Sequence, residues 1–154
     1  MILLDTNVLI YAFEDESPHC AWAGDTIADA VASGGAAISA VSLAELCVGD
    51  ADPGTVADRV RSWGVAILDL PSAAAEPCAQ AYGRYRGTDS GPSSAGTMAS
   101  RKRRQSKSGT SAPPMPLPDF FIGAHAEIMA WRIATADRGR FKTYFPAVSL
   151  LEPS

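Results

Sequence analysis

Short apolar runs alternate with longer stretches of helical periodicity along most of the chain. The apolar runs predict β-strands at residues 2–4, 36–39, 65–68, 132–135 and 148–151. The intervening stretches predict helices at residues 19–33, 42–48, 53–63, 72–86 and 119–130. Ser17 as N-cap and Pro18 at the first helical position are expected to start the first of these helices. Strands that alternate with helices pair in parallel and are covered on both faces, so the sequence predicts an α/β fold with a mainly parallel sheet.

Residues 87–118 depart from this alternation. Gly, Ser, Thr and Pro dominate there, and neither helical nor strand periodicity is visible. The interval from Arg84 to Lys107 holds seven bases and one acid, so it carries +6, although the whole chain has 13 Lys and Arg against 17 Asp and Glu and carries −4. We expect a flexible basic loop on an acidic body, either a solvated linker or a segment that contacts an anionic partner such as RNA. Its candidate RNA-binding residues are Arg84, Arg86, Arg101, Lys102, Arg103 and Arg104.

The length of 154 residues, 47% of them hydrophobic, predicts one domain with one core. The three cysteines lie 27 and 31 residues apart, which excludes a zinc knuckle or a disulfide framework and suits a reducing compartment. The N-terminus has no basic region, and the longest uncharged stretch has 15 residues. We therefore expect neither a signal peptide nor a membrane span, and a cytoplasmic location.

Four acidic residues follow predicted strands, where the ligand site of a parallel α/β sheet lies: Asp5, Glu45, Asp119 and Asp137. Each also has a structural interpretation, because acids favour helix N-termini and the stretch from Ser42 to Glu45 fits a capping box. Four neighbouring carboxylates repel one another unless a cation neutralises them, and hard oxygen ligands select Mg²⁺ or Mn²⁺. The group predicts a divalent-metal site suited to phosphodiester hydrolysis.

Four segments in order resemble the PIN-domain ribonucleases and, among them, the VapC toxins of prokaryotic toxin–antitoxin pairs. They are residues 2–10 with the Asp5-Thr6-Asn7 motif, residues 41–46, residues 118–126 and residues 133–146. The resemblance implies a single three-layer α/β/α domain whose four acids form a metal pocket. It assigns Asp5 and Asp119 to the ion directly, with Glu45 and Asp137 completing the site and a metal-activated water as nucleophile. Thr6, Asn7 and Thr135 are then expected to orient the carboxylates or the water by hydrogen bonds without contacting the ion.

The same resemblance implies an endoribonuclease dependent on Mg²⁺ or Mn²⁺ that cleaves cellular RNA, often a tRNA. It also implies two protein partners: a cognate VapB-type antitoxin whose segment plugs the acidic pocket, and a second copy of the chain in a homodimer. The long basic loop before Asp119 departs from the family pattern. It is either an insertion or an arm that holds the RNA backbone near a pocket that repels phosphate.

Two other functions remain open from the sequence. A phosphoaspartyl enzyme also places an Asp after its first strand, but it needs a second carboxylate where this chain has Asn7 and a late Lys, for which only Lys142 is present. A catalytically inactive PIN-like module that binds RNA or protein would keep the acids as helix caps and need no ion. Serine-hydrolase, P-loop and dinucleotide motifs are absent, and His19 and His125 lack the spacing of a zinc site.

Overall fold

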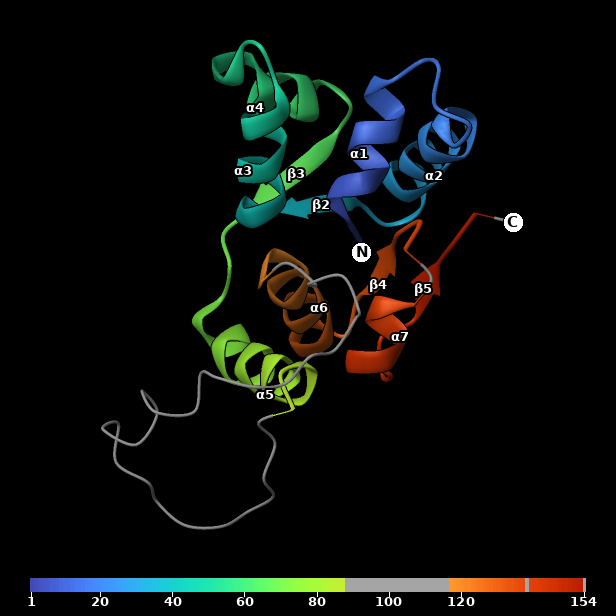
Figure 1. Ribbon diagram of the computed structural model, residues 1–154. Coiled ribbons are helices and arrows are strands. Elements are labelled where there is room, and N and C mark those ends of the chain that lie inside the picture. The colour runs from blue at the N-terminus through green and yellow to red at the C-terminus, as the bar shows by residue number, and fades with distance from the viewer. Residues whose placement is uncertain (88–116, 138, 154) are drawn as a thin grey trace.

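The computed structural model describes residues 1–87, 117–137 and 139–153. Their five strands all pair in parallel and form one sheet in the order β3-β2-β1-β4-β5 (Figure 1). The strands are β1 (Ile2–Leu4), β2 (Ala36–Ser39), β3 (Val65–Leu68), β4 (Arg132–Ala134) and β5 (Leu150–Leu151). The first strand is therefore central, and the chain adds β2 and β3 on one side of it and β4 and β5 on the other.

Helices cover both faces of this sheet (Figure 1). One face carries α1 (Thr6–Phe13), α2 (Cys20–Ser33), α3 (Ala40–Gly49) and α4 (Pro53–Ser62). The other carries α5 (Ala75–Tyr85), which follows a 3₁₀ turn at Ser72–Ala74, together with α6 (Leu117–Met129) and α7 (Arg140–Tyr144). The predicted α/β/α architecture is confirmed, and every strand pair described is parallel.

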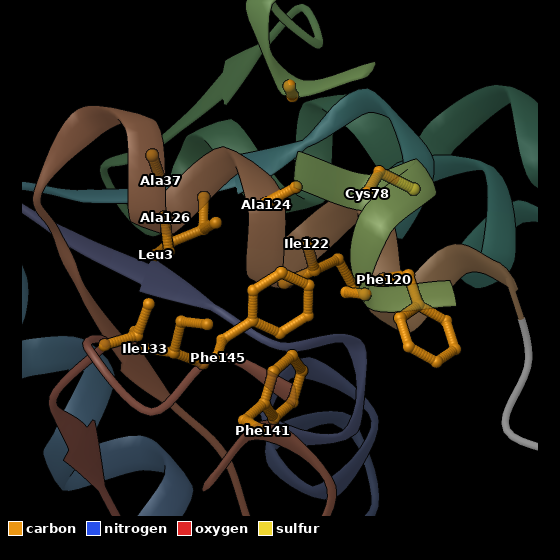
Figure 2. Packing of buried hydrophobic residues seen from close by; sticks show 13 residues of the cluster. Leu3, Ala37, Cys78, Phe120, Ile122, Ala124, Ala126, Ile133, Phe141 and Phe145 are labelled. Carbon is orange, nitrogen blue, oxygen red and sulfur yellow. The ribbon is translucent and has the colours of Figure 1, made fainter. Parts of the chain in front are cut away.

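Alternation along the strands produces two cores. Leu3 packs with the cluster under α5, α6 and α7, whereas its neighbour Leu4 packs with the cluster under α1 to α4. Successive strand residues point to opposite faces, and in a sheet covered on both faces each side must be apolar. Figure 2 shows the first of these clusters, in which Phe120, Phe141 and Phe145 are each almost fully buried. The two clusters thus pack against the two faces of β1 and hold in place the strand ends that carry the polar residues described below.

The predicted strand boundaries are confirmed for β1, β2 and β3, while β4 and β5 are shorter than predicted. Helix α1 was not predicted, because eight residues are too few to show a clear helical period. Helix α6 begins at Leu117, two residues before the predicted start and within the predicted loop of residues 87–118. Residues 88–116 of that loop lie outside the described residues.

Two predicted helix starts are wrong. The capping box at Ser42 does not form: α3 begins at Ala40, and Ser39 is its N-cap, with Oγ accepting a hydrogen bond from the backbone N–H of Val41 at 2.9 Å. Helix α2 begins at Cys20 rather than at Pro18, while Ser17 accepts a hydrogen bond from the backbone of His19 at 3.3 Å. In the first case the strand ends on a serine that can cap at once, so the helix starts earlier than the Ser-x-x-Glu pattern predicts.

The three cysteines, Cys20, Cys47 and Cys78, are free thiols in the structure, and Cys78 is buried. In the described part of the chain, no helix has both the length and the apolar character needed to cross a membrane.

Candidate active site

The polar residues predicted to share a site follow three neighbouring strands. Asp5 comes directly after β1, Thr135 directly after β4, and Glu45 lies on α3, which follows β2 without a gap. The order β2-β1-β4 brings these ends together at one edge of the sheet. The backbone N–H of Asp5 donates to the carbonyl of Ala134 at 2.9 Å, so the β1–β4 ladder extends to the first residue of the site. Parallel strands expose their carboxyl ends on the same side, which is where ligands bind in open α/β sheets.

A pocket of about 250 Å³ opens at this edge. All four predicted acids line it, together with five further residues. The complete lining is Asp5, Thr6, Asn7, Ile10, Glu45, Asp119, Asp137, Arg140 and Phe141. The structure therefore brings together carboxylates that lie up to 132 positions apart in the sequence.

Asp5 is the most buried acid of the pocket, with 4% of the residue exposed. Its Oδ1 accepts a hydrogen bond from the backbone N–H of Thr6 at 2.8 Å, which makes Asp5 the N-cap of α1. Its Oδ2 accepts two more, from Nδ2 of Asn7 at 2.6 Å and from Oγ1 of Thr135 at 2.7 Å. Three donors thus fix the orientation of one carboxylate, and all three belong to residues predicted to surround the site.

Thr6 and Asn7 also connect this carboxylate to the neighbouring strand ends. Oγ1 of Thr6 donates to Oε2 of Glu45 at 2.6 Å, which joins α1 to α3. Oδ1 of Asn7 accepts from the backbone N–H of Ala136 at 3.2 Å, which joins α1 to the segment after β4. The residues Thr6 and Asn7 therefore connect Asp5, α3 and the segment after β4 through hydrogen bonds.

Burial raises the pKa of two of these carboxyl groups. Burial raises the pKa of Asp5 from 3.8 to about 7, against the hydrogen bond from Thr135, and the negative charges of Asp119 and Glu45 raise it further. Burial likewise raises the pKa of Asp119, although the neighbouring Arg140 lowers it. Near neutral pH Asp5 is close to its midpoint, so a cation beside it would favour the charged form.

Arg140, the first residue of α7, forms ion pairs with two of the four acids, Asp119 and Asp137. Its Nη1 lies 3.1 Å from Oδ2 of Asp119, and its Nε lies 2.9 Å from Oδ2 of Asp137. The remaining oxygen of Asp137 accepts from the backbone N–H of Gly139 at 3.3 Å. Among the described residues that line the pocket, Arg140 is the only base. It offsets part of the negative charge of the four acids.

The donor set fits a hard divalent cation in its chemistry, because carboxylate oxygens are the ligands that Mg²⁺ and Mn²⁺ prefer. The arrangement is not yet that of a coordination sphere. Within residues 1–87, 117–137 and 139–153, no three acidic, histidine or cysteine side chains stand close enough to ligate one ion together. Ion binding would therefore require the carboxylates to move closer to one another. Two of the acids, Asp119 and Asp137, are also paired with Arg140.

The interpretation of the acids as residues of helix N-termini holds for two of the four. Asp5 caps α1, and Asp119 lies in the first turn of α6, where an acid is favoured. Glu45 is the sixth residue of α3 and lies beyond its first turn. Asp137 is not the N-cap of α7, because that position is held by Gly139. Helix capping therefore does not explain why these four side chains meet.

The residues predicted to bind RNA lie away from the pocket or outside the described part of the chain. Arg84 and Arg86, at the end of α5, are exposed and do not line the pocket. Nη2 of Arg84 donates to the backbone carbonyl of Tyr144 at 2.7 Å, which ties α5 to α7. The other four predicted contacts, Arg101, Lys102, Arg103 and Arg104, lie outside the described residues.

The phosphoaspartyl alternative finds no support in the geometry. Lys142, the late lysine it requires, pairs with Glu152 at 2.7 Å and does not line the pocket. Asn7 donates its amide to Asp5 and supplies no second carboxylate.

Arg140 was not predicted as a site residue. Its signal was the Asp137-x-x-Arg140 spacing, which resembles an ordinary ion pair on a helix surface. Ile10 and Phe141 also line the pocket, and an apolar pattern gives no hint of such a role.

Comparisons with known proteins agree with this architecture. The model of the PIN domain family matches residues 2–145. No curated protein matches the chain.

Several solved structures share the fold across almost the whole chain. DNA-bound VapBC from Salmonella typhimurium has a TM-score of 0.63 at 17% identity and covers 98% of this chain and 96% of that chain. FitAcB from Neisseria gonorrhoeae has a TM-score of 0.58 at 22% identity and covers 99% and 98%. A toxin–antitoxin complex from Klebsiella pneumoniae has a TM-score of 0.59 at 19% identity and covers 100% and 98%.

Proposed function

The chain belongs to the PIN-domain family, and from this premise we propose that it is a divalent-metal-dependent endoribonuclease, the toxin of a VapBC-type pair. One observation carries the proposal. Carboxylates from four separate segments line one pocket at the carboxyl edge of the sheet: Asp5, Glu45, Asp119 and Asp137. Such a group repels a phosphodiester on its own, and a hard divalent cation would reverse that repulsion.

Asp5 and Asp119 are the residues that we propose to hold the ion directly. Burial raises the pKa of both carboxyl groups, so a nearby cation would favour their charged forms. Glu45 and Asp137 complete or orient the set. When bound, Mg²⁺ or Mn²⁺ would polarise the phosphodiester and lower the pKa of the attacking water.

The surrounding polar residues would keep this set in place. Thr135 and Asn7 hold Oδ2 of Asp5, and Thr6 holds Glu45 through its hydroxyl. Groups that already orient metal-ligating carboxylates lower the cost of assembling the site, and their loss typically costs about 10- to 100-fold in metal affinity.

RNA, and tRNA in particular, is the substrate that we propose, following the resemblance of the sequence motifs to VapC toxins. The basic residues that we propose to contact the RNA are Arg84, Arg86, Arg101, Lys102, Arg103 and Arg104. Their positive charges would bind the phosphates of the RNA backbone, independently of the nucleotide sequence. We also propose a cognate VapB-type antitoxin that plugs the pocket and a homodimer, in the cytoplasm. The fold is shared with chains of VapBC and other toxin–antitoxin complexes, which supports an antitoxin partner.

One observation favours a second function, a catalytically inactive PIN-like module that binds RNA or protein. Arg140 already pairs with Asp119 and Asp137, and no three of the described acids are in place to ligate an ion. A protein that had lost its ion would gain from such an internal cation.

Cleavage of a mixed tRNA pool by the purified chain distinguishes the two functions. The assay compares Mn²⁺, Mg²⁺ and EDTA, and the native chain with Asp119→Asn. Asp58→Asn is the matched control, because Asp58 is 85% exposed on α4 and lies outside the pocket.

We expect cleavage with either ion, loss of cleavage in EDTA and in Asp119→Asn, and full activity in Asp58→Asn. Absence of cleavage under every condition, together with no binding of Mn²⁺ by calorimetry, would replace the nuclease with the binding module. Cleavage that survives both EDTA and Asp119→Asn would contradict the carboxylate–metal mechanism.

A further inference from the structure

Arg140 is a cation placed among the acids of the pocket. Its guanidinium bridges two of them, with Nη1 3.1 Å from Asp119 and Nε 2.9 Å from Asp137. These two contacts use different nitrogens of one planar group, so one side chain holds both carboxylates at once.

The bridge uses the oxygens that a divalent ion would need. Oδ2 of Asp119 and Oδ2 of Asp137 each accept from Arg140. The second oxygen of Asp137 accepts from the backbone of Gly139. A guanidinium and a divalent cation also repel each other at such short range. The two cations therefore cannot hold both carboxylates in the same way at the same time.

Arg140 can leave the pocket without loss of the core. Its side chain is 37% exposed, and it is the first residue of a five-residue helix whose buried anchor is the next residue, Phe141. A rotation about side-chain bonds takes the guanidinium into solvent while Phe141 stays in place. The side chain of Asp119 is only 16% exposed, and Asp119 lies on the long helix α6. The side chain of Arg140 is therefore freer to move than that of Asp119.

We propose that Arg140 is an internal counter-cation that competes with the divalent ion for Asp119 and Asp137, so that ion binding requires Arg140 to release Asp119. This inference rests on the proposed function, because it takes the four acids to be an ion site. It adds that the chain itself sets its affinity for the ion through one basic residue.

Calorimetric titration with Mn²⁺ alone, without RNA, tests the competition. The titration is run at pH 8, above the raised pKa of Asp5 near 7, on the native chain and on Arg140→Ala. Because partly exposed ion pairs of this kind are weak, removal of the two pairs is expected to tighten Mn²⁺ binding by roughly two- to tenfold. Lys142→Ala is the matched control: it removes the same charge from the same helix, but Lys142 pairs with Glu152 outside the pocket. Its dissociation constant should stay within about twofold of the native value, because distant exposed charges are screened.

A second variant and a second measurement guard against misfolding. Arg140→Gln keeps the length of the side chain and removes only the charge, and it should tighten Mn²⁺ binding in the same direction. A ligand that binds the folded state more tightly also raises Tm more. The rise in Tm on adding Mn²⁺ should therefore be larger in both variants than in the native chain and in Lys142→Ala.

The outcomes separate this inference from the proposed function. Tighter binding in both Arg140 variants, with Lys142→Ala unchanged, supports the competition. Binding by the native chain with equal or weaker binding by the variants would overturn it and make Arg140 a positioning residue, while the proposed ion site would stand. Failure of the native chain and both variants to bind Mn²⁺ would overturn both.

Discussion

The raised pKa of Asp5 couples the stability of the fold to pH. The carboxyl group ionises near 3.8 in the unfolded chain and near 7 in the folded one. Between these pH values the unfolded chain releases its proton while the folded chain keeps it. The stability linked to Asp5 is therefore fully present below pH 3.8, falls as the pH rises and levels off above pH 7.

The size of this effect follows from the two pKa values. They differ by about 3 pH units, and each unit corresponds to about 1.4 kcal/mol, so the full effect is about 4 kcal/mol. Between pH 5 and pH 8, the accessible part is about 2–3 kcal/mol, because the part of the loss that falls between pH 3.8 and pH 5 lies outside this range.

Asp5→Asn isolates this contribution. The amide cannot ionise, so the variant lacks the loss of stability with rising pH. Its NH₂ group faces donors from Asn7 and Thr135, which costs roughly 1–3 kcal/mol, but this cost does not depend on pH. The free energy of unfolding of Asp5→Asn relative to the native chain should therefore rise by about 2–3 kcal/mol from pH 5 to pH 8.

Urea unfolding in EDTA at pH 5, 6, 7 and 8 measures this difference. With a slope of about 2 kcal/mol per molar urea, the gap between the two midpoints should change by about 1 M over this range. Asp58→Asn, in which an exposed carboxyl is lost, should follow the native profile. Parallel profiles for Asp5→Asn and the native chain would contradict this prediction, because they would mean that burial does not shift the ionisation of Asp5.

Three further substitutions test the supports of the pocket. Thr135→Val removes the hydroxyl that donates to Asp5, so Mn²⁺ binding by calorimetry should weaken by roughly tenfold, and an unchanged dissociation constant would count against a supporting role. Gly123→Ala places a Cβ on the ring of Phe145, so the free energy of unfolding in urea should fall by about 1–3 kcal/mol, and a neutral result would show that α6 can shift away. Ser39→Ala removes the N-cap of α3, the helix that carries the carboxylate bonded to Thr6, and should lower the same free energy by about 1 kcal/mol without moving the Mn²⁺ dissociation constant more than about twofold.

The sequence pattern predicted the central sheet well because its strands are short, apolar and bounded by polar residues. The boundaries of β2 at Ala36–Ser39 and β3 at Val65–Leu68 agree with the structure. The parallel pairing followed from alternation with helices. With parallel strands, the residues that follow the strands fall at one edge, and this is why Asp5, Glu45, Asp119 and Asp137 could be placed together from the sequence. The place of Thr135 beside Asp5 followed from the resemblance to the PIN-domain ribonucleases.

Helix ends were harder to predict, since several residues near each start can act as a cap. At α3, Ser39 and Ser42 both fit, and the sequence cannot weigh the geometry by which the end of β2 presents Ser39. Ser42 is instead fully buried inside the helix. Helix α1 was missed because its apolar run at residues 8–10 is equally consistent with a strand.

The contact between Arg140 and the acids was not predictable from spacing. Asp119 and Arg140 are 21 positions apart, and their meeting depends on how α6 and α7 pack on the same face of the sheet. The hydrophobic pattern indicates which side of each helix packs on the sheet, but only within a broad range of rotation. Whether two side chains on neighbouring helices meet depends also on the direction in which each side chain points. The gathering of the four acids at one edge of the sheet was thus predictable from the sequence, whereas the direction of the Arg140 side chain was not.

A crystal structure of the chain soaked in Mn²⁺, read by anomalous scattering, shows directly whether these carboxylates bind an ion. We predict an anomalous peak between Asp5 and Asp119, with the guanidinium of Arg140 no longer bonded to Asp119. A peak elsewhere, or no peak in a crystal that retains the Arg140 bridge at millimolar Mn²⁺, would contradict the claim that these carboxylates form an ion site.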